Sequence, residues 1–182
     1  DSIGTMEVPV KAYYGVQSLR AKNNFRITGR PLHPEFIKNL ARIKKAAAYT
    51  NMIAHVLDEE KGKAIAQACD GIIGGKLHGQ FLVDAIQGGA GTSANMNANE
   101  VIANRAIEKK KKKKGDYTVV HPNDHVNMAQ STNDVIPCAG KLTILGLLPG
   151  LLSELERLQK ALRQKSIEFD DVVKMGRTQL QD

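Results

Sequence analysis

The sequence of 182 residues predicts an all-α, mostly helical protein, and three observations support this fold class. Apolar residues recur at helical spacing from Pro34 onward. Residues that commonly cap helices precede these segments, and glycines follow them. Beyond Asn133, a leucine-rich seam continues to Leu162. With 42% hydrophobic residues, the chain has enough apolar side chains for a sizeable core in one or two domains.

The first third of the sequence predicts an arm followed by one helix. Residues 1–33 show little periodicity and many helix-breaking residues, so we expect an extended arm and loops there. From Pro34 to about Val56 we expect a helix, because apolar residues recur every three or four positions. Its apolar positions are Phe36, Ile37, Leu40, Ile43, Ala46 and Ala47.

Two further helices are expected in the middle of the chain. Asp58 is a good cap for the first, which stops at Gly74. A short apolar run at residues 81–86 then leads into a glycine-rich turn. The second helix is expected from Ser93 to Lys114.

The leucine seam predicts a long bundle helix that reaches about Phe169. Its apolar positions follow steps of three and four: Val135, Ala139, Leu142, Leu145, Leu148, Leu152, Leu155, Leu158 and Leu162. Such a helix spans on the order of 50 Å, which is more than this chain can cover, so partner helices are expected outside it. Pro149 lies in its interior and is expected to kink or break it. The alternative is two shorter helices folded back at Pro149 and Gly150.

Charge and composition argue against nucleic-acid and membrane partners. The net charge is +7, and residues 109–114 are six lysines, which leaves 7 − 6 = +1 for the rest of the chain. We interpret this run as a solvated helix end, followed by Gly115 as the C′ residue. No apolar stretch is expected to reach the roughly 20 residues of a membrane span, and no signal pattern begins the chain. A cytoplasmic location is therefore expected.

Cysteine spacing predicts neither disulfides nor a metal site. Cys69 and Cys138 stand on predicted helices, do not match metal-ligand spacing, and are expected to be reduced and in or near the core.

Asn95, Asn97 and Asn99 are poor helix formers in a helical stretch, which suggests a buried polar network or an exposed polar face.

Two blocks carry the functional signal. In residues 88–100 and 130–134, small hydroxyl and amide residues stand where helices begin. Backbone N–H groups and the positive end of the helix converge at such places, which bind carboxylates or phosphates. Two blocks in one chain suggest a small dianion. Taken singly, Thr92, Ser131 and Thr132 could equally be simple caps.

Four motifs together resemble the aspartase and class II fumarase superfamily. They occupy residues 91–100, 121–127, 130–134 and 176–182, and residues 12–17 are similar as well. The resemblance covers essentially the whole chain. It implies an N-terminal helical domain over residues 1–130, followed over residues 131–182 by the first long helix of a central helical bundle.

Within this superfamily the sequence resembles aspartases more than fumarases. Gln179 stands where fumarases typically have histidine, and Ser131-Thr132 replaces their more common pair of serines. The implied reaction converts L-aspartate to fumarate and ammonia through loss of a Cβ proton and an aci-carboxylate intermediate, without a cofactor or metal. A fumarase, or a lyase for another dicarboxylate, is the alternative. The resemblance also implies a homotetramer with active sites assembled from three subunits.

The resemblance assigns six substrate-binding residues: Thr92, Ser131, Thr132, Asn133, Thr178 and Gln179. The first three would donate to the β-carboxylate, where negative charge grows during the reaction. Asn133 and Gln179 would bind the amino group, and Thr178 the α-carboxylate.

Further positions are assigned with less support. His121, Asn123 and Asp124 match a secondary dicarboxylate site of fumarases. The family's general-base serine lies on a loop that has no counterpart in these residues, so we expect the chain alone to be inactive. A non-enzymatic basic helical module that binds acidic partners through residues 109–114 is a third reading.

Overall fold

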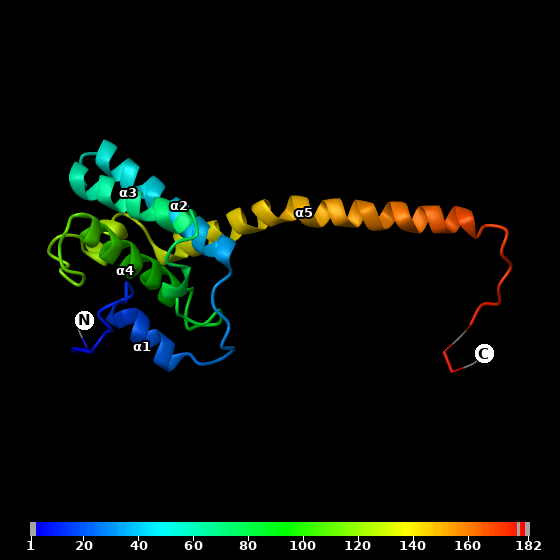
Figure 1. Ribbon diagram of the computed structural model, residues 1–182, viewed down its shortest axis with the longest axis horizontal. Coiled ribbons are helices and arrows are strands. Elements are labelled where there is room, and N and C mark those ends of the chain that lie inside the picture. The colour runs from blue at the N-terminus through cyan, green and yellow to red at the C-terminus, as the bar shows by residue number, and fades with distance from the viewer. Residues whose placement is uncertain (1–2, 178, 181–182) are drawn as a thin grey trace. The chain divides into compact units, whose positions relative to one another are not determined.

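The computed structural model describes residues 3–177 and 179–180, and these residues form helices and loops without a strand (Figure 1). The predicted all-α class is therefore confirmed. The elements are α1 (Val16–Asn24), α2 (Pro34–Ile53), α3 (Glu59–Ile73), the short 3₁₀ helix η1 (His78–Gln80), α4 (Thr92–Lys109), the π-helical turn η2 (Pro122–Val126) and α5 (Thr132–Glu168).

The chain divides into two compact units, Asp1–Ile144 and Leu145–Asp182. The division falls within α5. It reflects contacts within this chain and does not test the predicted domain boundary at residue 130, which stays a prediction.

Helix α4 forms the centre of the first unit. It contacts α1, α3 and η2, while α2 packs mainly on α3 (Figure 1). From Ala94 to Asn104 every residue of α4 is buried. The core contains these fully buried side chains: Leu40, Ile65, Cys69, Ile72, Ala98, Val101, Ile102, Ala106, Ile107 and Val120. Because α4 is buried on all sides, its apolar residues do not recur on one face only, and asparagines stand at buried positions among them.

The ends of α2 and α3 follow the predicted signals. His33 caps α2 by accepting a hydrogen bond from the Glu35 N–H at 3.2 Å. The Asp58 carboxylate caps α3 by accepting from the Lys61 N–H at 3.0 Å, as predicted. The buried face of α2 differs from the predicted one, because it includes Lys44, whereas Ala46 is exposed.

The prediction that residues 1–33 are an arm and loops is wrong for Val16–Asn24, which form α1. The cause is a distant carboxylate. Glu100 of α4 accepts hydrogen bonds from the N–H groups of Gly15, Gln17 and Ser18 at 2.8, 3.1 and 3.1 Å, and also from the Ser18 hydroxyl. A carboxylate at the first turn satisfies N–H groups that the helix itself leaves unpaired.

Helix α4 ends at Lys109, five residues before the predicted end. Lys111 has a φ of 57°, so the chain leaves the helix there, and Gly115 is not the C′ residue. Asn104 holds the following loop, because its side chain accepts from the Gly115 N–H at 2.8 Å and donates to the Tyr13 carbonyl at 2.8 Å. The lysine side chains lie at the surface, where Lys110 pairs with Glu60 at 2.9 Å.

Helix α5 is continuous from Thr132 to Glu168, and its length agrees with the prediction. Pro149 does not break it, so the alternative of two helices is wrong. Proline removes one backbone hydrogen bond, a cost of about 3 kcal/mol that a helix of 37 residues rich in leucine, glutamate and lysine tolerates.

The exposed apolar residues of α5 correct one expectation. An 18-residue window of this helix has a mean hydropathy of 1.7 with 11% of the window buried, so its length and composition would suit a membrane span. The expectation that no stretch reaches that length is therefore wrong. One such helix is weak evidence for a membrane, because long helices of soluble proteins meet the same criteria.

The two cysteines have different surroundings. Cys69 is completely buried, and burial raises the pKa of its thiol to about 12. Cys138 is exposed on α5, contrary to the expectation that it lies in or near the core.

Candidate functional site

The two helix starts that carry the functional signal are neighbours in the first unit. The Asn95 side chain in the first turn of α4 donates a hydrogen bond to the Thr132 hydroxyl oxygen of α5 at 2.9 Å. Gly91, just before α4, lies against Ile136, so that a Cβ atom at Gly91 would be 2.9 Å from that side chain. The blocks around Thr92 and Thr132 therefore meet in the same place.

At the start of α4, Thr92 is not the residue that caps the helix. Gly91 is the N-cap residue with a φ of 93°, a left-handed conformation that glycine adopts without strain, and the Gln87 side-chain oxygen accepts a hydrogen bond from the Ala94 N–H of the first turn at 2.5 Å. Thr92 is the first helical residue and is exposed. The reading of Thr92 as a simple cap is therefore wrong, and its hydroxyl stands beside the positive end of α4.

At the start of α5, one predicted residue does cap the helix. The Ser131 hydroxyl oxygen accepts a hydrogen bond from the Asn133 N–H at 3.2 Å. Ser131 and Asn133 are exposed, and Thr132 is half-buried. The serine hydroxyl still has its own hydrogen to donate, since only its oxygen serves the cap.

Two buried or partly buried partners lie next to the helix starts: Lys44, which the sequence analysis did not single out, and Asn127, the last residue of the 121–127 motif. Lys44 of α2 is completely buried, and its ammonium donates to the Asn127 side-chain oxygen at 2.7 Å. Asn127 accepts in addition from the Asn95 side-chain amide at 3.1 Å. The burial of Lys44 could have been predicted from its position four residues after Leu40, on the apolar face of the predicted helix.

Burial governs the charge of this lysine. It lowers the pKa of the Lys44 ammonium from its ordinary 10.5 to about 7, because the charged form loses hydration in the core.

Asn95, Asn97 and Asn99 of α4 are all buried, which agrees with the first of the two readings given by the sequence and rules out an exposed polar face. Asn97 is fully buried, accepts from the Leu82 N–H at 2.9 Å and donates to the Gln80 carbonyl at 3.0 Å. These bonds attach the loop before the glycine-rich turn to α4. Among the residues that the structure describes, the side-chain oxygens of Asn95 and Asn99 are buried without a hydrogen-bond partner.

The residues of the predicted secondary site lie together at η2, with His121 as its N-cap residue and Asn123 and Asp124 within it. The His121 ring nitrogen Nδ1 accepts from the N–H groups of Asn123 and Asp124, both at 3.2 Å, and is 3.2 Å from an Asp124 carboxylate oxygen. His125 Nδ1 in turn accepts from the His121 N–H at 2.7 Å. This turn is held by its own side chains, and its binding role stays a prediction.

The last motif lies in the second unit. Gln179 is exposed in the second unit, and Thr178 lies outside the described residues. Within the described ranges no group of three or more histidine, cysteine, aspartate or glutamate side chains could hold a metal ion. The arrangement of hydroxyls and helix starts in the first unit suits binding of a carboxylate.

Comparison with known proteins assigns the chain to a family. A family model described as "Lyase" matches residues 4–182, so the chain belongs to this lyase family. Proteins described as "Aspartate ammonia-lyase" are similar to it over its whole length: one from Bacillus subtilis is 56% identical and one from a Bacillus species 53% identical. The chain spans 38% and 39% of their lengths, and it matches their N-terminal portion.

Solved structures show the same fold. A "fumarate lyase:delta crystallin" from Brucella melitensis in native form superposes with a TM-score of 0.91 at 52% identity, over 100% of this chain and 43% of that one. A recombinant class II fumarase from Schistosoma mansoni gives a TM-score of 0.85 at 37% identity, over 98% of this chain and 38% of that one. The predicted resemblance to the aspartase and class II fumarase superfamily is thereby confirmed.

Proposed function

We propose that this chain forms the N-terminal portion of an ammonia-lyase that converts L-aspartate to fumarate and ammonia. The observation that carries the proposal is the meeting of two helix starts, bridged by the 2.9 Å bond between Asn95 and Thr132. The relatives described as aspartate ammonia-lyases support the choice of substrate. We call the protein in which this chain is that N-terminal portion the complete lyase.

In the proposed reaction the hydroxyl groups bind the carboxylate that gains charge. Loss of the Cβ proton places a second negative charge on the β-carboxylate, which becomes an aci-carboxylate. Hydroxyls of Thr92, Ser131 and Thr132 donate to it, and the positive ends of α4 and α5 stabilise it further. Fixed donors of this kind favour the transition state because they need no reorientation as the charge develops.

Three further residues are assigned to the leaving amino group and the other carboxylate. Asn133 and Gln179 accept hydrogen bonds from the amino group, and Thr178 donates to the α-carboxylate. The proton acceptor is a serine outside this chain. A homotetramer and a cytoplasmic location belong to the same proposal.

The 182-residue chain alone is proposed to be catalytically inactive. It spans 38% of the Bacillus subtilis relative, and general-base catalysis needs a base within hydrogen-bond reach of the Cβ proton. Mixing the chain with aspartate and following ultraviolet absorbance tests this directly. Fumarate production above a heat-killed control, abolished by Thr92→Ala, would show that the base lies within these residues.

A class II fumarase is the second candidate, favoured by the fold shared with the Schistosoma mansoni enzyme. The complete lyase separates the two. It should release fumarate from L-aspartate and much less from L-malate, and Gln179→Ala should weaken turnover of aspartate while the melting temperature is unchanged. The opposite substrate preference would establish the fumarase, and activity with neither substrate would contradict both.

A further inference from the structure

The side-chain amide of Asn127 lies between the Lys44 ammonium and the Gln130 backbone carbonyl. Its oxygen is 2.7 Å from the Lys44 ammonium, and its Nδ2 donates to the Gln130 carbonyl at 3.0 Å. An ammonium only donates, whereas a backbone carbonyl only accepts. One orientation of the Asn127 amide therefore satisfies both neighbours, with its oxygen toward Lys44.

This orientation decides the direction of the next two hydrogen bonds. The Asn127 oxygen also lies 3.1 Å from Asn95 Nδ2, which must then donate. The same Nδ2 lies 2.9 Å from the Thr132 hydroxyl oxygen, which must accept. A hydroxyl whose oxygen accepts from the protein keeps its hydrogen for another partner.

The reversed direction of the bond between Asn95 and Thr132 would give a hydrogen-bond partner to a buried polar atom that lacks one. The Asn95 side-chain oxygen is buried and lacks a hydrogen-bond partner among the described residues. With its amide turned around, this oxygen would accept the Thr132 hydroxyl hydrogen. Leaving a buried acceptor unpaired is unfavourable, so the observed direction needs groups that enforce it. Lys44 and the Gln130 carbonyl are those groups.

We propose that Lys44 is a positioning residue, which through Asn127 and Asn95 keeps the Thr132 hydroxyl hydrogen available to the substrate carboxylate. The proposal rests on the proposed function for the role of Thr132 and adds how its donor direction is set. Lys44 does not contact substrate, because it is completely buried beneath the helix starts. Lys44 therefore acts through other side chains, unlike a lysine whose ammonium binds the substrate carboxylate directly.

A double-mutant cycle in the complete lyase tests the proposal. Thr132→Val should lower kcat/KM for aspartate about a hundredfold, as for loss of one oxyanion-type donor, and Lys44→Met roughly tenfold. If Lys44 acts through the Thr132 hydroxyl, Lys44→Met should have no further effect in the Thr132→Val background. Additive losses would overturn the proposal.

Two variants separate positioning from packing. Lys44→Arg retains an obligatory donor and should recover part of the activity lost in Lys44→Met. Lys45→Met is the matched control, because Lys45 is the next residue on α2 but pairs at the surface with Asp70 at 2.6 Å. The control should keep kcat/KM within about twofold of wild type, since surface ion pairs contribute little. A larger loss in Lys45→Met than in Lys44→Met would contradict the proposal.

A spectroscopic measurement on the 182-residue chain keeps the proposal testable if the complete lyase has no activity or if a variant fails to fold. As Lys44 loses its proton, the side-chain amide resonances of Asn127 and Asn95 should shift together with its ammonium signal. The Asn97 amide is the internal control, because its bonds go to Leu82 and Gln80 instead. An Asn95 resonance that does not follow Lys44 would refute the hydrogen-bond chain, independently of any catalytic result.

Discussion

Gly91 and Ile136 are in such close contact that a Cβ atom on the glycine would lie 2.9 Å from two carbon atoms of the isoleucine. This contact joins the start of α4 to the first turns of α5. Two requirements meet at the glycine, because its φ of 93° also disfavours any side chain. The relative position of the two helix starts depends on this one small residue.

Gly91→Ala is therefore expected to destabilise the chain by about 1–3 kcal/mol, as overpacking and a strained φ act together. Thermal unfolding followed by circular dichroism measures the loss. Gly71→Ala is the matched control, because Gly71 lies within α3 and a Cβ atom there would meet nothing within 4 Å. The control should gain roughly 0.5–1 kcal/mol, as alanine is the better helix former. Equal effects at both positions would contradict the role of the contact with Ile136.

Glu100→Gln is expected to release α1 from the first unit. The amide that replaces the carboxylate would place an N–H group against the backbone N–H groups of Gly15, Gln17 and Ser18. Loss of a buried charged acceptor costs on the order of 2–4 kcal/mol. Hydrogen exchange should accelerate in Val16–Asn24 before other helices respond. In Glu60→Gln, which alters a surface pair, exchange in α1 should stay as in wild type.

Buried Lys44 makes stability depend on pH in alkaline solution. Its pKa is 10.5 when hydrated and about 7 in the core, so between these values the unfolded state binds more protons than the folded state. The free energy of unfolding should then rise with pH from about 7 to 10.5, by up to about 5 kcal/mol from this group. Of the groups facing it, the Cys69 thiol stays neutral in this range, because its pKa is about 12, and the Asn127 amide does not titrate.

The contribution of Lys44 is isolated by comparing wild type with Lys44→Met at each pH. Denaturant unfolding should show a difference in unfolding free energy that shrinks or reverses as the pH rises, because Lys44 becomes neutral in the folded state. A difference that is constant from pH 6 to about 10 would show that Lys44 keeps its ordinary pKa in the core.

Ser131→Ala tests the two roles of this hydroxyl separately. As the cap of α5, it should contribute about 1 kcal/mol to stability. As a donor to the substrate, it should contribute roughly a hundredfold to turnover in the complete lyase. Ser153→Ala, in the exposed part of α5, should change neither quantity appreciably. If activity falls only in proportion to stability, Ser131 is a cap and not a binding residue.

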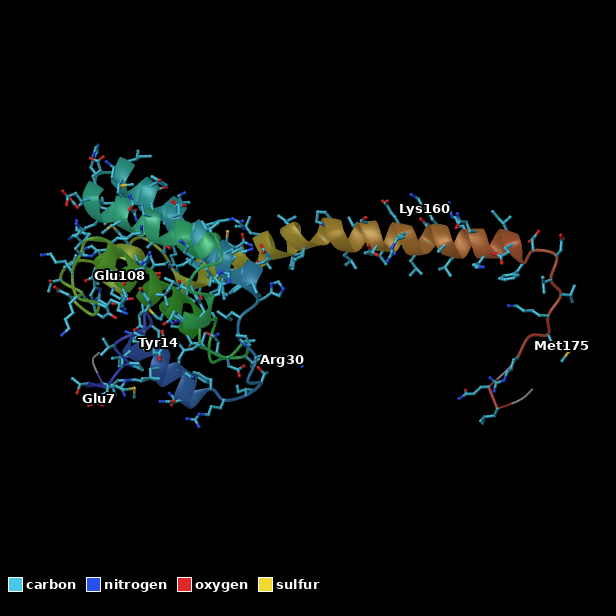
Figure 2. The ribbon with its side chains drawn as sticks, in the orientation of Figure 1. Glu7, Tyr14, Arg30, Glu108, Lys160 and Met175 are labelled. Carbon is cyan, nitrogen blue, oxygen red and sulfur yellow. The ribbon has the colours of Figure 1, made fainter. Side chains whose placement is uncertain are left out.

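The exposed leucines of α5 predict self-association. Within Leu145–Asp182, the side chains of Leu152, Leu155 and Leu158 are each at least 50% exposed, and Figure 2 shows side chains projecting from this part of the helix. An apolar stripe of this length usually marks an interface. Leu155→Asp should weaken association, since it would place an unpaired charge in a buried seam.

Light scattering at micromolar concentration measures this association. The control is Lys160→Asp, which introduces the same carboxylate at a position that helical periodicity places away from the leucines. The control variant should associate like wild type. A wild-type chain that stays monomeric would contradict the interface.

The sequence by itself determined the features that depend on local interactions. Asp58 predicted the start of α3, and the leucine spacing predicted the length of α5, because capping and periodicity act within a few residues. The two blocks of hydroxyl and amide residues predicted helix starts for the same reason. Family resemblance then related those starts to a dicarboxylate.

Only the tertiary structure decided the features that join distant segments. Helix α1 depends on Glu100, which lies 82 residues along the chain from Ser18, and local propensity does not report such a partner. The sequence analysis did not single out Lys44, because only the packing of α2 into the core places its ammonium 2.7 Å from the Asn127 side-chain oxygen. Local sequence sets where helices begin and end. Long-range packing decides which polar groups lose water, and therefore which of them must find partners inside the protein.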